Sequence, residues 1–154
     1  MRIIAPRRAG HVYEQTLAGT PDAVFPLLCP VRETEWVPGW CPLEVRSATG
    51  VAEPDCVFTT AADDGTVATW AVTRHDPAAK EVHFLKLTPG VTACRIEIAL
   101  RAAPGGCKAR VAYTHTSLGP SGDAVVEAFT AEAYEAFMRR WEDCLNARLA
   151  GDGA

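Results

Sequence analysis

The sequence predicts an α+β domain in which a curved antiparallel sheet of about seven strands is wrapped around one long C-terminal helix. Three features carry this prediction: a first strand at 11–18 followed by two short helices, a succession of alternating segments between 43 and 118, and an amphipathic stretch at 121–149. The chain has 154 residues, of which 48% are hydrophobic and 22% are charged, so it can bury a substantial core as one domain.

The N-terminal part begins with a strand at 11–18, where successive side chains point to opposite faces. The Thr-Pro-Asp sequence at 20–22 then begins a helix, because it supplies an N-cap, a proline at the first helical position and an acidic residue in the first turn. Pro26 limits this helix to 22–28, since proline lacks the N–H that a helix interior needs. A second short helix is predicted at 30–36.

Six further strands are separated by turns that contain glycine, proline or aspartate. They are predicted at 43–52, 56–61, 66–74, 81–87, 91–102 and 107–118. A four-residue loop at 103–106 joins the last two strands and sets their register, because it pairs inward side chains with inward side chains. The expected pairs are Ile98 with Val111, Ile96 with Tyr113, and Cys94 with His115.

Alternation of apolar and polar residues predicts the orientation of one middle strand and leaves that of another open. The strand at 66–74 is expected to turn Trp70 and Val72 toward the core. The strand at 81–87 carries apolar side chains on both faces, and the sequence does not choose between its two orientations. Either Val82 and Phe84 face inward, or Leu85 and Leu87 do.

The stretch at 121–149 is predicted to form one continuous helix of roughly 40 Å, counted at about 1.5 Å per residue. Ser121 is the expected N-cap, and Asp123 and Glu127 lie in the first turns. One face is charged, so the helix should lie with its opposite, apolar face on the sheet. The apolar face consists of Val125, Val126, Phe129, Ala133, Phe137, Trp141, Leu145 and Leu149.

Composition and motifs exclude several classes of function. The net charge of −4 disfavours nucleic-acid binding, and no apolar run reaches the roughly 18 residues of a membrane span. Six cysteines without a CxxC pair, and the lack of a secretory signal, favour reduced thiols in the cytoplasm and no metal site. No glycine-rich phosphate loop is present, so no cofactor is expected. The oligomeric state, monomer or homodimer, stays open.

Four segments resemble the START-like superfamily, whose bacterial members are called the SRPBCC or polyketide cyclase/dehydrase group and which includes birch-pollen-allergen-like proteins. The segments are TPDAVFPLL at 20–28, EWVPGW at 35–40, VAYT at 111–114 and FMRRW at 137–141. The similarity covers 11–149 within a single ligand-binding domain, 1–154. It implies the helix-grip fold, and members of the superfamily include lipid and hormone carriers, aromatic cyclases and proteins of no established activity.

A sheet bent around a helix leaves a cavity at its open end, and such cavities hold small hydrophobic ligands. The residues expected to contact the ligand are Trp36, Trp40, Trp70, Phe84, Ile96, Tyr113, His115, Phe129 and Phe137. The alternative is that these side chains fill a closed core.

His115 and Tyr113 are the candidate catalytic residues, because both face inward on the last strand. An imidazole with a pKa of about 6.5 can transfer protons near neutral pH. A tyrosine beside a histidine could polarise a carbonyl and move a proton, as cyclisation or dehydration of a poly-β-ketone requires. The alternative is that His115 only hydrogen-bonds a backbone carbonyl near the end of its strand.

Four other residues are weaker candidates. Cys94 beside His115 could be a thiolate nucleophile, although no oxyanion hole accompanies it. Glu33 and Glu35 on the second short helix belong to a solvated face, or else supply a carboxyl of raised pKa at the cavity mouth. Arg74 either pairs with a ligand carboxylate or is a charge at the end of a hairpin.

Three functions follow from these observations. The first is a protein that binds a small hydrophobic or aromatic molecule in its cavity. The second is an aromatase/cyclase-type enzyme that acts on a polyketide-like substrate, with His115 and Tyr113 as its acid and base. The third is a small interaction domain with a closed core. The presence of a cavity separates the first two functions from the third.

Overall fold

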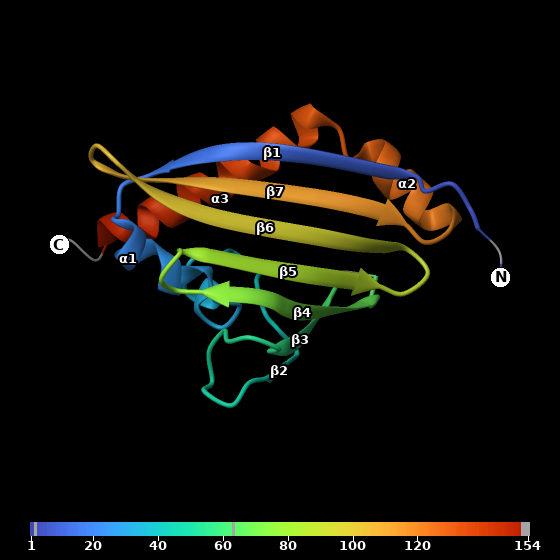
Figure 1. Ribbon diagram of the computed structural model, residues 1–154, viewed down its shortest axis with the longest axis horizontal. Coiled ribbons are helices and arrows are strands. Elements are labelled where there is room, and N and C mark those ends of the chain that lie inside the picture. The colour runs from blue at the N-terminus through green and yellow to red at the C-terminus, as the bar shows by residue number, and fades with distance from the viewer. Residues whose placement is uncertain (2, 63, 152–154) are drawn as a thin grey trace.

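The computed structural model describes residues 1, 3–62 and 64–151. Within these residues, one antiparallel sheet has seven strands in the order β1-β7-β6-β5-β4-β3-β2 (Figure 1). The strands are β1 (Arg8–Leu17), β2 (Glu44–Arg46), β3 (Val57–Ala61), β4 (Val67–Asp76), β5 (Glu81–Thr88), β6 (Thr92–Ala103) and β7 (Gly106–Ser117). The sheet curves around the C-terminal helical segment, so the predicted α+β helix-grip architecture is confirmed.

The helices follow the first and the last strand. They are α1 (Pro21–Val24), the 3₁₀ helices η1 (Phe25–Leu28) and η2 (Arg32–Glu35), α2 (Pro120–Ala128) and α3 (Ala131–Gly151). Thr20 begins α1 as predicted, because its hydroxyl accepts a hydrogen bond from the Ala23 N–H at 3.3 Å. Both predicted short helices are present after β1, and α3 crosses one face of the sheet along its length (Figure 1).

The prediction of a single continuous C-terminal helix is wrong, because the chain breaks at Phe129 and Thr130. Phe129 leaves helical geometry with φ −79° and ψ 67°. Thr130 then caps α3: its hydroxyl accepts from the Ala133 N–H at 3.2 Å, and its carbonyl accepts from the Tyr134 N–H at 3.0 Å. A threonine hydroxyl stabilises such a start because it satisfies an N–H that has no partner within the helix. The longer piece, α3, has 21 residues and is roughly 30 Å long.

The buried face of α3 also differs from the predicted stripe. The buried residues of this helix are Tyr134, Met138 and Leu145. Phe137, which was expected on that face, is 39% exposed. The Tyr134 hydroxyl donates to the Val111 carbonyl at 2.8 Å, and the Gln15 amide donates to the Met138 carbonyl at 3.1 Å. These bonds hold one side of α3 on β1 and β7 and leave Phe137 partly exposed.

The register predicted for the last hairpin is confirmed. Ile98 lies opposite Val111, Ile96 opposite Tyr113, and Cys94 opposite His115. Trp70 and Val72 are both buried, as expected. The predicted strand at 43–52 is much shorter, because the Ser47 hydroxyl donates to the Val51 carbonyl at 2.6 Å and folds the chain into a turn after β2.

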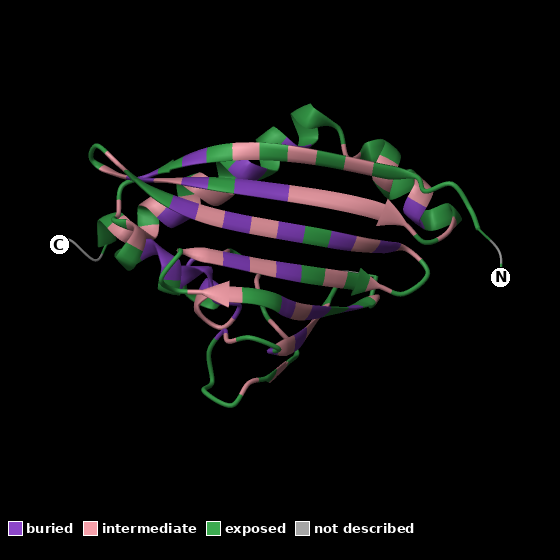
Figure 2. Ribbon diagram, viewed as in Figure 1, coloured by how far each residue is buried: buried purple, intermediate pink, exposed green. Residues whose placement is uncertain are grey.

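The structure decides the orientation of β5. Val82 and Phe84 face inward and are 1% and 5% exposed, whereas Leu85 and Leu87 lie on the outer face. The inward pair lies opposite the inward isoleucines of β6, so the paired strands bury one continuous face. Figure 2 shows the resulting alternation of buried and more exposed residues along β5 and β6.

Candidate ligand-binding cavity

A cavity of about 420 Å³ lies between the inward face of the sheet and the C-terminal helical segment. Two rows of directly opposed side chains line it on the sheet side. The first row, across β4, β5, β6 and β7, consists of Trp70, Lys86, Cys94 and His115. The second row, across β5, β6 and β7, consists of Phe84, Ile96 and Tyr113. The helical side is lined by Phe129, Ala133, Tyr134, Phe137 and Trp141.

Eight of the nine residues predicted to contact a ligand lie on the cavity wall. They are Trp40, Trp70, Phe84, Ile96, Tyr113, His115, Phe129 and Phe137. Trp36 does not line the cavity: its indole N–H donates to the Leu27 carbonyl at 3.0 Å, and its ring packs 4.9 Å from that of Trp141. Trp36 therefore supports a wall residue. A space of this size could hold several waters, so the closed-core alternative does not describe this protein.

Sequence reasoning missed several wall residues, including Phe58, Lys86 and Ile98. The two-residue period of a strand could have found two of them. Lys86 must face inward once Phe84 does, and Ile98 lies two residues beyond the inward Ile96.

His115 lies in the first row, with its Nε2 atom 3.5 Å from the Cys94 sulfur and its ring 4.6 Å from the Phe129 ring. Its Nδ1 atom is buried without a hydrogen-bond partner among the described residues. Burial, and then the nearby Lys86 ammonium, lower the pKa of His115 to about 4, so the ring is neutral at pH 7. The alternative prediction was that His115 hydrogen-bonds a backbone carbonyl. Among the described residues, the polar partner of His115 is instead the Cys94 thiol.

Cys94 is a buried thiol. Burial raises the pKa of Cys94 to about 12, so the sulfur keeps its proton at neutral pH. Reactive cysteines have a lowered pKa and partial exposure, so these properties speak against the interpretation of Cys94 as a thiolate nucleophile. All six cysteines of the chain are free.

Tyr113 occupies the second row, with its ring 5.5 Å from Tyr134 and 6.1 Å from Phe137. Burial, and then the nearby Glu33 carboxyl, raise the pKa of Tyr113 well above its ordinary value. The phenol therefore keeps its proton and is a hydrogen-bond donor on the cavity wall.

Glu33 lines the cavity and is only 8% exposed, so it does not belong to the predicted solvated face. Helix η2 is a 3₁₀ helix with three residues per turn, which places Glu33 on the same side as the buried Trp36. This spacing was the available sequence signal. Burial raises the pKa of Glu33 to about 8, so the carboxyl is mostly protonated at pH 7.

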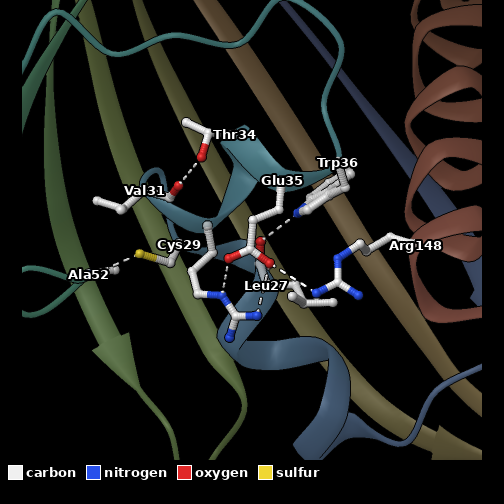
Figure 3. Close-up of polar contacts among 9 residues, drawn as sticks. Leu27, Cys29, Val31, Thr34, Glu35, Trp36, Ala52 and Arg148 are labelled. Atoms are coloured by element: carbon white, nitrogen blue, oxygen red, sulfur yellow. Dashed lines mark hydrogen bonds and ion pairs between the residues drawn. The ribbon is translucent and has the colours of Figure 1, made fainter. Parts of the chain in front are cut away.

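Glu35, in contrast, is partly exposed and connects η2 to α3 (Figure 3). Its carboxylate accepts from Arg32 Nε at 2.7 Å and from Arg148 Nη2 at 3.0 Å. These two guanidinium groups lower the pKa of Glu35 to about 2. Because Arg148 lies on α3, the ion pair holds the short helix that carries Glu33 beside the helix that covers the cavity.

The basic side chains of Lys86 and Arg74 have different surroundings. Lys86 lines the cavity, with its Nζ atom 4.8 Å from the centre of the Trp70 ring, and burial lowers its pKa. Arg74 is half exposed and pairs with Asp76 at 3.2 Å and Glu81 at 2.9 Å. Arg74 is therefore the hairpin-end charge of the two alternatives.

Contacts from the sheet fix the break between α2 and α3. The His11 Nε2–H donates to the Phe129 carbonyl at 2.8 Å, and the two rings lie 5.0 Å apart. At the other end of α2, Gly122 packs so closely that a Cβ atom there would overlap the Val91 carbonyl oxygen. Both contacts keep Phe129 against His115 at the cavity wall.

Solved structures match the fold over nearly the whole chain. A norcoclaurine synthase point mutant from Thalictrum flavum, in complex with a transition-state analogue, aligns with a TM-score of 0.70 and 12% identity over 99% of this chain and 100% of that chain. Ara h 8.0201 aligns with a TM-score of 0.65 and 16% identity over 94% and 99% of the two chains. The chain has the helix-grip fold. A third helix-grip structure, of a protein from Rhodobacter sphaeroides, aligns with a TM-score of 0.66 and 18% identity over 92% of each chain.

No family model matches this helix-grip chain, and a search of the curated proteins finds no match. Among the described residues, no helix is both long enough and apolar enough to cross a membrane. The same residues contain no group of three or more His, Cys, Asp or Glu side chains arranged to hold a metal ion.

Proposed function

We propose that the protein binds a small hydrophobic molecule with an aromatic part in the cavity between the sheet and α3. The observation that carries this proposal is an internal space of about 420 Å³ with mostly aromatic and aliphatic walls and a few polar groups. Small-molecule sites typically have volumes of about 300–1,000 Å³ and this kind of lining.

Glu33 and Tyr113 indicate one polar group of the ligand. Both keep a proton at neutral pH, because burial raises the pKa of each. Both residues line the same cavity. Two donors on an apolar wall favour a ligand with an acceptor oxygen, such as a ketone.

Filling the cavity from α3 should weaken binding of an aromatic probe. Ala133 lines the cavity, so the indole of an Ala133→Trp variant should occupy the space and weaken binding of N-phenyl-1-naphthylamine about tenfold or more. The matched control is Ala136→Trp, at an exposed position of the same helix that does not line the cavity. Probe fluorescence in titrations would report both affinities. Equal affinities for the two variants, or no binding to the wild-type protein, would contradict the proposal.

A second function is favoured by Glu33: an aromatase/cyclase-type enzyme that acts on a polyketide-like substrate. A carboxyl with a pKa of about 8 can both release and accept a proton near neutral pH, which general acid–base catalysis requires. In this hypothesis Tyr113 donates to the substrate carbonyl, and Glu33 and the neutral His115 exchange the proton at the neighbouring carbon. Norcoclaurine synthase, crystallised with a transition-state analogue, has the same fold, so the fold is compatible with catalysis.

The enzyme hypothesis predicts proton exchange beside a carbonyl. Wild-type protein in deuterated buffer at pH 7 should speed deuterium uptake at the methyl group of 2-acetylnaphthalene, as followed by NMR. Glu33→Gln cannot exchange this proton and should lower the rate by about 10²–10⁴ while N-phenyl-1-naphthylamine still binds. A wild-type rate equal to that of buffer alone would remove the enzyme hypothesis and leave ligand binding.

A further inference from the structure

Lys86 is exceptional among the three lysines of the chain. Lys80 pairs with Asp22 at 2.6 Å, and Lys108 pairs with Glu14 at 3.6 Å and donates to Thr16 at 2.7 Å. Lys86 makes no ion pair with a carboxylate among the described residues, although it is the lysine that lines the cavity. The lysine that lines the cavity is therefore the one for which the described residues supply no carboxylate partner.

The groups around Lys86 carry no negative charge. Trp70 on β4 and Cys94 on β6 lie directly opposite it, and His115 lies one strand further, on β7. The Cys94 thiol and the His115 ring are both neutral at pH 7, and the Trp70 ring offers only its π-face. Glu33, the carboxyl on the cavity wall, is mostly protonated at this pH.

An ammonium group in such a place is costly unless an anion joins it. Its indole contact with Trp70 offsets part of that cost, since the face of an aromatic ring attracts a cation. No described residue of the cavity wall supplies a full negative charge at pH 7. Burial accordingly lowers the pKa of Lys86, and a bound anion would raise it again.

We infer that the ligand is an aromatic monocarboxylic acid whose carboxylate binds Lys86 beside Trp70, while its apolar body fills the aromatic part of the cavity. This inference rests on the proposed binding function and names the class of ligand. One ammonium balances one carboxylate. A phosphate monoester would bring nearly two charges, whereas Lys86 is the one charged base among the described residues that line the cavity. The protonated Glu33 does not repel such an acid.

The two aromatic probes 2-naphthoate and 2-naphthamide test this charge, because they have nearly the same shape and differ in ionisation. Isothermal titration at pH 7 should show that the wild-type protein prefers 2-naphthoate about tenfold or more, since a charge-assisted hydrogen bond is stronger than a neutral one. Lys86→Met keeps the length of the side chain and should weaken 2-naphthoate binding about tenfold or more, with 2-naphthamide changed less than about twofold. Lys108→Met removes a lysine that does not line this cavity and should leave both affinities unchanged.

Three outcomes would overturn the inference. If Lys86→Met weakens the binding of both naphthalene probes equally, Lys86 contributes only to the shape of the cavity. Equal affinity of the wild-type protein for the two probes, with N-phenyl-1-naphthylamine still bound, would reject the acid and leave the proposed binding function intact. Failure of the wild-type protein to bind either naphthalene probe or N-phenyl-1-naphthylamine would reject both.

Discussion

Replacing Glu33 with glutamine is expected to stabilise the protein progressively as the pH rises. The unfolded chain releases this proton near pH 4.5, whereas burial keeps it on the folded protein until about pH 8. The folded state therefore binds more protons between these values, and the wild-type protein loses stability across that window. Glutamine does not ionise, so the variant avoids the loss, which is on the order of 4 kcal/mol for a shift of this size.

Urea unfolding at pH 5, 7 and 9 would measure the difference in unfolding free energy between Glu33→Gln and the wild-type protein. The control is Glu35→Gln on the same short helix. The pKa of Glu35 is lowered to about 2, so its contribution to stability is lost only as the pH falls below about 4.5. The difference in unfolding free energy between Glu35→Gln and the wild-type protein should therefore stay constant from pH 5 to pH 9. If the difference in unfolding free energy for Glu33→Gln is also independent of pH, the Glu33 carboxyl of the wild-type protein is solvated.

Truncation of Met138 is expected to cost far more stability than truncation of its neighbour Phe137. Met138 is fully buried on the side of α3 that packs against the sheet, so Met138→Ala should lower the unfolding free energy by about 2–5 kcal/mol. Phe137 is 39% exposed and lines the cavity, so Phe137→Ala should cost less than about 1 kcal/mol and instead weaken binding of N-phenyl-1-naphthylamine. Chemical denaturation and probe titration of both variants would check this. A larger stability loss for Phe137→Ala would contradict the observed face of α3.

The sheet was largely predictable from the sequence, because alternation and turn residues are local properties. The register of the last hairpin followed from a loop of fixed length between two patterned strands. The orientation of β5 could not be predicted, since both of its faces are apolar. Only its pairing with β6 shows that Phe84, and not Leu85, faces inward. The helix break at Thr130 was hidden by apolar residues that continue at helical spacing on both sides of it.

The aromatic residues of the candidate site were predictable, because large aromatic side chains tend to lie on the inward face of a strand or helix. Burial of a charged residue is harder to foresee, because it depends on tertiary contacts. Glu33 lies on the same side of η2 as the buried Trp36, and Arg148 of α3 holds that helix through Glu35. The sequence predicts a short helix there, and the three-residue spacing of Glu33 and Trp36 was the one local sign of which acid is buried.

The two sides of α3 have consequences for how this protein could change over generations. Tyr134 and Met138 secure the helix to the sheet, while the exposed residues Ala133 and Phe137 line the cavity. Mutations at the second pair alter the shape of the cavity and leave the anchoring contacts in place, so they are less readily purged for loss of stability. Descendants can therefore diverge in what they recognise while inheriting the same scaffold.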